Sequence, residues 1–417
     1  MLYLNHSMKI NGFDSSEVLH IEAPTLLEAS RILGYKNKAI TKEILKKNLV
    51  GAGKKKYLQK CLKELEILEN LSKKGYFKVG GVNYAKRYLD AIKGFSQGSE
   101  ITIAETIFLQ KEIQPGCQTM IAKNENGGFS FLHTEENSPD DNTLPVYNYR
   151  VVEMKIPGKE VVFFAFPGLC GWGPAFGVDR TNMFAQLVDD IYIADKFSGS
   201  LWSNMVAFII FDTGSVKRAG LLFKKIATVG RRHGFSSGYA VHTVQYKDKA
   251  EIASHEFGGK LVRKSNSFSN IFAQVNYSNN DELKKMADFY PPKNLKNWDK
   301  DRQMEYLEVT RREARLMDLG KMGLWKTSSA DATLKTGLRV LAYPHGDLRK
   351  YKGRDGKMVY YHTGLPSRWT FAHFVGYLGK YSKFYIGKKT PAPIKGMEYS
   401  NDIDENYKYA EEKLWKL

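Results

Sequence analysis

The sequence predicts a mixed α and β fold of the sandwich type, and three features of the chain lead to this expectation. Residues 24–112 carry a helical pattern, Cys117 begins a segment with the period-two pattern of a β-hairpin, and strand pairs then alternate with helix pairs. Such alternation suits packed sheets better than a doubly wound parallel sheet. We expect one integrated domain, because the sequence contains neither an internal repeat nor a low-complexity linker.

Three helices are expected before Cys117. Residues 42–74 repeat apolar side chains at spacings of three and four between Lys and Glu, which predicts an amphipathic helix. A second helix is expected over residues 84–95 and a third over 103–113. Pro115 and Gly116 then end helix formation.

A β-hairpin is expected next. The segment CQTMIAKNENGGFSFLHTEE contains an apolar strand, an Asn-Gly-Gly turn and a second strand in which Phe129 and Phe131 alternate with other residues. Further strands are expected at 147–154, 161–166, 240–245, 259–264, 340–343 and 357–362. Helices are expected at 179–192, 281–289 and 300–319, with a buried segment at 201–211.

The composition is that of a globular, basic protein. Of 417 residues, 42% are hydrophobic and 13% aromatic, which is enough apolar material for a substantial core. The formal charge of +18 favours anionic partners. The basic residues are spread along the chain, however, without an Arg-rich arm or zinc-finger spacing. We therefore expect a solvated basic surface, with no nucleic acid or membrane as partner.

Cysteine usage and the apolar stretches bear on localisation. Cys61, Cys117 and Cys170 cannot form a disulfide framework, which indicates a reducing compartment. The opening residues lack the apolar region of a signal peptide, and Gly and Pro interrupt the longest apolar stretches. The sequence therefore predicts a cytoplasmic protein.

Several familiar motifs are incomplete. VGAGKKK at 50–56 lacks the first Gly and the hydroxyl residue of a phosphate-binding loop, and GWGPAFG at 171–177 has Phe176 where a dinucleotide fingerprint needs its third Gly. His133, Glu135 and Glu136 are residue types that bind metals, but no second His lies nearby in sequence. No metal site is expected from this pattern.

The segment QPGCQTMIAKNENGGFSFLHTEEN resembles the processing site of the acyl-coenzyme A:6-aminopenicillanic acid acyltransferase family, which is related to choloylglycine hydrolase. The matching features are the Gly116–Cys117 bond, the hydroxyl of Thr119, the glycine turn and the tetrad His133–Glu136. Five further segments resemble family blocks in family order: LDAIKGFSQGSEITIAETIFLQKEI (89–113), FAFPGLCGWGPAFGVDRTNMFAQLVDD (164–190), KSNSFSN (264–270), YLEVTRREARLMDL (306–319) and MVYYHTGLPS (358–367).

The resemblance implies an α+β fold, the four-layer αββα sandwich of N-terminal-nucleophile (Ntn) hydrolases. It also implies self-cleavage between Gly116 and Cys117 into a helical α chain (1–116) and a catalytic β chain (117–417), both part of the same fold. The product is an αβ heterodimer or a higher oligomer. Its substrate is a small-molecule amide or acyl thioester.

The expected chemistry centres on Cys117. Its thiol attacks the preceding carbonyl, and Gly116 tolerates the strained geometry because it has no Cβ. Cleavage frees an α-amine whose reference pKa of about 7.7–8.0 suits a general base. One residue then supplies nucleophile and base. Water as acceptor makes the protein an amidase, whereas an amine makes it an acyltransferase. Neither reaction requires a metal or a diffusible cofactor.

The resemblance assigns roles to other positions as well. Glu136 stands where the family has an Asp that orients the nucleophile and amine. If the Glu136 side chain points away from Cys117, Glu135 on the opposite face of the strand takes this role or the site is inactive. Asn266 matches a donor to the oxyanion, and His133 falls where related hydrolases carry an Arg. Arg312 best fits an Arg that braces Glu136 or the substrate, with the neighbouring Arg311 and Arg315 as alternatives.

Two positions depart from the family pattern and leave an alternative open. Glu136 is one methylene longer than Asp, and Asp189 replaces an Asn that supports the oxyanion. A carboxylate donates no hydrogen bond unless it is protonated, so Asp189 is expected on a helix surface instead. Both departures support a catalytically degenerate, basic binding protein of the same fold.

Overall fold

The computed structural model describes residues 7–11, 17–51, 53–112, 116–124, 127–136, 149–172, 175–191, 199–247, 250–265, 271–275, 348–352, 358–362, 370–380 and 382–388. Contacts divide the chain into two compact units. Unit 1 consists of Met1–Gly12, Gly116–Asn137 and Phe268–Leu417, and unit 2 of Phe13–Pro115 and Ser138–Ser267. Each unit therefore combines segments from both sides of the 116/117 bond. The chain is a mixed α and β protein with several sheets.

Most of the helices that the structure describes lie in the first segment of unit 2. They are α1 (Leu26–Asn48), α2 (Lys54–Lys73), α3 (Tyr84–Ser99) and α4 (Ile103–Glu112), with the short strands β3 (Lys78–Val79) and β4 (Val82–Asn83) before α3. The helical prediction for this region is confirmed, but the helix expected at 42–74 is divided between α1 and α2. Gly51 has a φ of 82°, a left-handed conformation that interrupts a helix.

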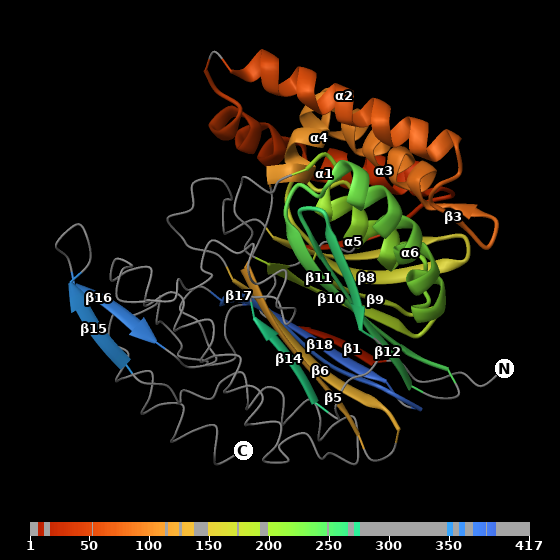
Figure 1. Ribbon diagram of the computed structural model, residues 1–417. Helices are drawn as coiled ribbons and strands as arrows, with labels where there is room; N and C mark the ends of the chain where they lie inside the picture. Colours follow the sequence, from red (N-terminus) through yellow and green to blue (C-terminus); the bar gives the residue numbers. More distant parts are fainter. Residues whose placement is uncertain are drawn as a thin grey trace. The chain divides into compact units, whose positions relative to one another are not determined.

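The sheet of unit 2 has eight strands (Figure 1). Neighbours in the sheet pair antiparallel, except that β2 and β7 are parallel. In spatial order the strands are β13 (Leu261–Ser265), β12 (Ala250–Gly258), β11 (Gly238–Tyr246), β10 (Phe184–Ile191), β9 (Phe176–Asp179), β8 (Lys159–Ala165), β7 (Arg150–Ile156) and β2 (Val18–Glu22).

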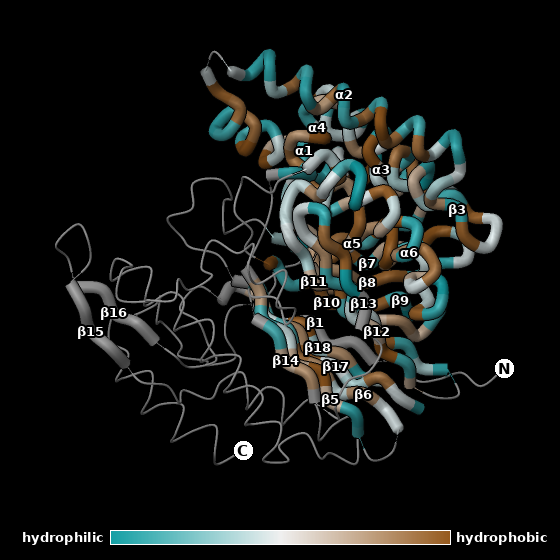
Figure 2. Tube along the Cα trace, in the orientation of Figure 1, coloured by the Kyte–Doolittle hydropathy of each residue, from teal (hydrophilic) through white to brown (hydrophobic). Residues whose placement is uncertain are grey.

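Helices α5 (Ser203–Asp212) and α6 (Val216–His233) lie against this sheet (Figure 1). The Gln186 side chain on β10 donates to the backbone carbonyl of Ala207 on α5 at 3.0 Å, and the Phe223 ring on α6 lies 4.6 Å from the ring of His255 on β12. Every residue of α5 is buried, and Figure 2 shows its hydrophobic character. The predicted buried segment at 201–211 is therefore this helix.

The helix predicted at 179–192 is wrong, because the structure has the end of β9 and the whole of β10 there. Each residue of β10 is buried and the strand has neighbours on both sides, so its apolar residues do not alternate with exposed ones. Helix α6 was not expected, although it has a clear start: the Ser215 hydroxyl accepts from the backbone N–H of Arg218. Strand β12 was not expected either.

The main sheet of unit 1 has six strands, and it contains the predicted hairpin. In spatial order they are β1 (Ser7–Asn11), β18 (Lys383–Lys388), β17 (Thr370–Leu378), β6 (Phe129–Glu136), β5 (Gly116–Lys123) and β14 (Ile271–Val275). Only the β1–β18 pair of this sheet is parallel. Phe131 packs against Phe374 and Phe384, with ring centroids 5.3 and 6.2 Å apart, and joins β6 to β17 and β18. The strand predicted at 357–362 is β16 (Met358–His362), which pairs with β15 (Leu348–Lys352).

The helices predicted at 281–289 and 300–319 and the strand predicted at 340–343 lie outside the described residues. Among the helices that the structure describes, none has both the length and the hydropathy required to cross a bilayer.

Candidate functional site

The β5–β6 hairpin of unit 1 brings together the side chains of the candidate site. In its register Cys117 lies opposite Glu135, and Thr119 lies opposite His133. Side chains two residues apart on a strand point to the same face, and directly opposed residues of an antiparallel pair are close neighbours. The four side chains therefore form one group on one face of two adjacent strands.

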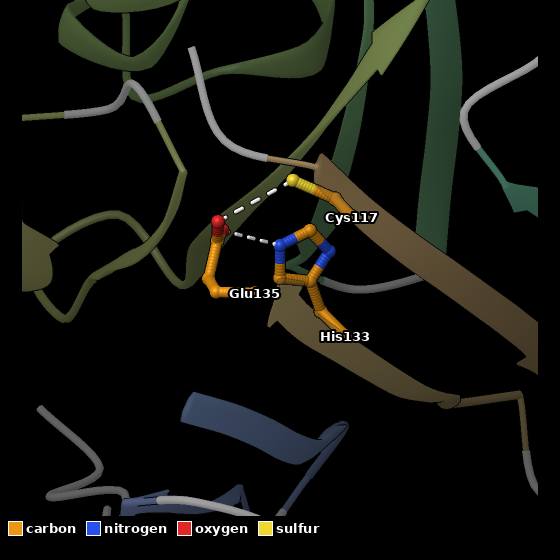
Figure 3. A group of neighbouring side chains, drawn as sticks. All are labelled: Cys117, His133 and Glu135. Atoms are coloured by element: carbon orange, nitrogen blue, oxygen red, sulfur yellow. Dashed lines mark hydrogen bonds and ion pairs between the residues drawn. The ribbon is translucent and has the colours of Figure 1, made fainter. Parts of the chain in front are cut away.

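A chain of hydrogen bonds connects this group, and Figure 3 shows its part from Cys117 through Glu135 to His133. The Cys117 thiol donates to Glu135 Oε2 at 3.3 Å, and the other carboxylate oxygen lies 2.7 Å from His133 Nε2. On the far side of the ring, His133 Nδ1 lies 2.7 Å from the Thr119 hydroxyl. We refer to Cys117, Glu135, His133 and Thr119 as the hairpin cluster.

The acceptor chemistry of Glu135 determines the direction of these bonds. An ionised carboxylate accepts hydrogen bonds and donates none, so the Cys117 thiol and the His133 Nε2–H are the donors. In a neutral ring Nδ1 then accepts from the Thr119 hydroxyl. Two opposed contacts hold the imidazole, and two donors hold the carboxylate.

The hairpin cluster is shielded from water. Cys117 is 1% exposed, and Thr119, His133 and Glu135 are 0% exposed. Burying a carboxylate is costly unless it is hydrogen-bonded, and Glu135 has two such partners in this cluster. Hydrogen bonds in such surroundings are stronger than in water, so the cluster positions its thiol firmly.

The structure brings some of the predicted site residues together and does not describe the side chains of the others. Cys117 and His133 lie together in the hairpin cluster, and Gly116 is the first residue of β5, directly before the thiol. Glu136 pairs with Gly116 and Thr370 through the backbone, and its side chain lies outside the described set.

Asn266 and Arg312, with its alternatives Arg311 and Arg315, also lie outside the described residues. Their proposed roles therefore remain predictions from the sequence.

The sequence indicated Glu135, the carboxylate that contacts the Cys117 thiol, only as the alternative to Glu136. The signal that identifies it is the hairpin register. Asn124 N–H donates to the carbonyl of Gly128, so the strands pair outward from a short turn, and counting outward from that turn puts Glu135 opposite Cys117. The family pattern pointed instead to the next residue along the strand.

Asp189 is not on a helix surface as expected, but in the middle of the unit 2 sheet. It is 0% exposed on β10, and its Oδ2 lies 2.8 Å from Nε2 of His242 on the adjacent strand β11. The Asp189 carboxylate therefore has a hydrogen-bonding partner within the unit 2 sheet, and this buried contact accounts for its position on a central strand.

The two other cysteines are buried packing residues in unit 2. Cys61 and Cys170 are 0% and 1% exposed. Burial raises the pKa of the Cys170 thiol well above its ordinary value, because the thiolate is disfavoured without water. Such a thiol is a poor nucleophile near neutral pH.

Comparison of the chain with protein-family models and with curated proteins finds no match.

Proposed function

We propose that this chain is a self-processing cysteine amidase or acyltransferase of the N-terminal-nucleophile type. One observation carries the proposal: the Cys117 thiol follows Gly116 at the start of β5 and donates to the buried carboxylate of Glu135. A thiol next to a glycyl carbonyl, with a fixed proton acceptor, has the groups that an N-to-S acyl shift requires.

Self-cleavage proceeds in two balanced steps. The Cys117 sulfur bonds to the Gly116 carbonyl carbon, the bond from that carbon to the Cys117 nitrogen breaks, and the thiol proton reaches the departing nitrogen by way of Glu135. Water then attacks the thioester. Its hydroxyl stays on the Gly116 carboxyl carbon, and its proton restores the thiol. The products are fragment 1–116 and fragment 117–417 with a free α-amine.

Turnover uses the same atoms on an external amide. The α-amine of Cys117 takes the thiol proton, the sulfur attacks the substrate carbonyl, and the proton passes to the leaving amine as the carbon–nitrogen bond breaks. Water or a second amine then resolves the thioester. Glu135 holds the thiol and the ammonium form of the amine in place, His133 holds Glu135, and Thr119 holds the His133 ring.

The remaining assignments of the proposal come from the family resemblance. Asn266 donates to the oxyanion, and Arg312 braces a carboxylate of the site or the substrate. The two largely antiparallel sheets and the helices against the unit 2 sheet are compatible with the four-layer αββα sandwich that we propose for the complete fold.

Intact mass spectrometry of the purified chain tests the proposal. Wild-type protein should appear as fragments 1–116 and 117–417, whereas Cys117→Ala should remain one folded polypeptide without amidase activity. Cys117→Ser should process slowly, because a hydroxyl is a weaker nucleophile than a thiol. Cys170→Ala is the matched control and should process like wild type. Cleavage of Cys117→Ala at the same bond, or an uncut wild-type chain, would reject self-processing and favour the binding-protein alternative.

A further inference from the structure

The hairpin cluster also contains three different metal-ligand atoms. A thiol sulfur from Cys117, a ring nitrogen from His133 and a carboxylate oxygen from Glu135 all lie within 4.8 Å of one another. No second His lies near His133 in the sequence, but the β5–β6 pairing supplies a cysteine as the third ligand type. We propose that this cluster binds a zinc ion, and that the bound ion blocks the reactivity of Cys117.

The distances from the Glu135 oxygens to the Cys117 sulfur and to the His133 nitrogen are near those that zinc requires. Bonds of about 2.0–2.3 Å to N, O and S ligands in a tetrahedral arrangement separate the ligand atoms by about 3.4–3.6 Å. The sulfur lies 3.3 Å from Glu135 Oε2, so this pair is almost at that separation. His133 Nε2 lies 2.7 Å from Glu135 Oε1, so this pair must open by roughly 0.7 Å as the ion replaces the proton between them.

The proton balance of binding is simple. The thiol loses its proton to solvent, and the neutral imidazole moves its proton from Nε2 to Nδ1. One zinc ion therefore displaces one proton. The Thr119 hydroxyl, 2.7 Å from Nδ1, changes from donor to acceptor by rotating its hydrogen. A histidine ligand is commonly oriented by such a bond to its second nitrogen, and Thr119 provides it from β5.

The ligand chemistry favours zinc over magnesium or calcium. Thiolate and imidazole are softer ligands that suit Zn²⁺, whereas the alkaline-earth ions prefer oxygen ligands alone. A divalent ion also balances the thiolate and the Glu135 carboxylate together in a site that excludes water.

Zinc and catalysis exclude each other at this site, because both use the same lone pairs of the Cys117 sulfur. In the uncut chain the hairpin cluster supplies three ligands to the ion. In fragment 117–417, and here the inference rests on the proposed function, the α-amine of Cys117 forms a five-membered chelate with its own sulfur. Zinc therefore inhibits the processed enzyme and delays self-cleavage of the precursor.

Spectroscopy with Co²⁺, followed by displacement with Zn²⁺, tests the site without an activity assay. The full chain should bind one Co²⁺ with a sulfur-to-cobalt charge-transfer band, and Zn²⁺ should abolish the band. Cys117→Ala should lose the band, and His133→Ala and Glu135→Ala should bind neither ion. Thr119→Val should weaken binding roughly 10–100-fold, the range for losing an outer-shell partner. Cys170→Ala and Cys61→Ala are matched controls and should bind like wild type.

The outcomes separate this inference from the proposed function. A thiolate–cobalt band that persists in Cys117→Ala, or no band in wild type, overturns the zinc site whether or not the chain is cleaved. A Cys117-dependent band in a chain that never cleaves keeps the zinc site and rejects self-processing. A chain that cleaves but is indifferent to Zn²⁺ keeps the function and rejects the zinc site.

Discussion

Glu135 and Glu136 are neighbours in sequence, but only the Glu135 carboxylate is described beside Cys117. Glu135 lies opposite Cys117 in the hairpin and accepts a hydrogen bond from its thiol, whereas Glu136 lies opposite Gly116. The family resemblance selects Glu136, and the contact selects Glu135. The two assignments predict different mutant behaviour.

We expect Glu135→Gln to slow self-cleavage by about 10²–10⁴-fold, the contribution of a positioned acid–base group. Glutamine keeps the shape of the side chain, but an NH₂ group replaces one carboxylate oxygen. Glutamine therefore cannot accept hydrogen bonds from both the Cys117 thiol and His133. Glu136→Gln is the matched control and should cleave at nearly the wild-type rate. Time-resolved mass spectrometry of freshly refolded precursor measures both rates. The reverse result would identify Glu136 as the working carboxylate.

At the scale of elements, helices α1 and α3 of unit 2 pack unusually closely. A Cβ at Gly94 would overlap the carbonyl oxygen of Leu27, and one at Gly98 would overlap that of Arg31. Helix α1 has such a glycine as well, because a Cβ at Gly34 would overlap the carbonyl of Phe95 on α3. These positions therefore require glycine because the backbones of α1 and α3 leave no space for a Cβ, and not because a turn needs a special conformation.

Gly98→Ala should lower the free energy of unfolding by about 1–3 kcal/mol, the cost of overpacking. In an isolated helix the same change is stabilising, because alanine has the higher helix propensity. Gly53→Ala is the control: Gly53 precedes α2 in a right-handed conformation, with no atom within 4 Å of an added Cβ. Urea denaturation of both variants measures the difference. Equal stability of Gly98→Ala and wild type would show that the helices are not in close contact.

On the scale of the whole of unit 2, one buried charge network connects four elements. Asp212 at the end of α5 accepts from Arg87 on α3 and from Lys159 on β8, and Lys159 also lies 3.6 Å from Asp179 on β9. Burial by itself raises the pKa of Asp212, but Lys159 and Arg87 outweigh it and lower the pKa below its ordinary value.

This lowered pKa makes the stability of unit 2 dependent on pH. A carboxylate whose pKa is lower in the folded state than in the unfolded state stabilises the protein fully at pH values above its unfolded-state pKa of about 3.9. This contribution is lost as the pH falls through the folded-state pKa. Asp212→Asn should therefore cost about 3–5 kcal/mol at pH 7, because it leaves the buried Lys159 and the partly exposed Arg87 without this carboxylate. The difference from wild type should shrink progressively below about pH 4.

Denaturation of wild type and Asp212→Asn between pH 3 and pH 7 measures this dependence. Asp90→Asn on α3 is the control, since the Lys86–Asp90 pair is largely exposed and should contribute about 0–1 kcal/mol. A pH-independent difference for Asp212→Asn would contradict the assignment.

The sequence by itself determined the features that local interactions dictate. The helices before residue 112 follow from apolar periodicity, and the β5–β6 hairpin follows from its Gly-containing turn and period-two strands. The family resemblance of this hairpin also identified Cys117 and His133 as residues of one site, and both belong to the hairpin cluster.

Only the tertiary structure decided which carboxylate contacts the thiol and which segments become central strands. Glu135 depends on the pairing register, and a shift of one residue exchanges it for Glu136. The residues of β10 are buried on both faces of a sheet, so their pattern carries no alternation and was mistaken for a helix. Contacts such as β6 with β17 join residues more than two hundred positions apart, and local patterns contain no information about such partners.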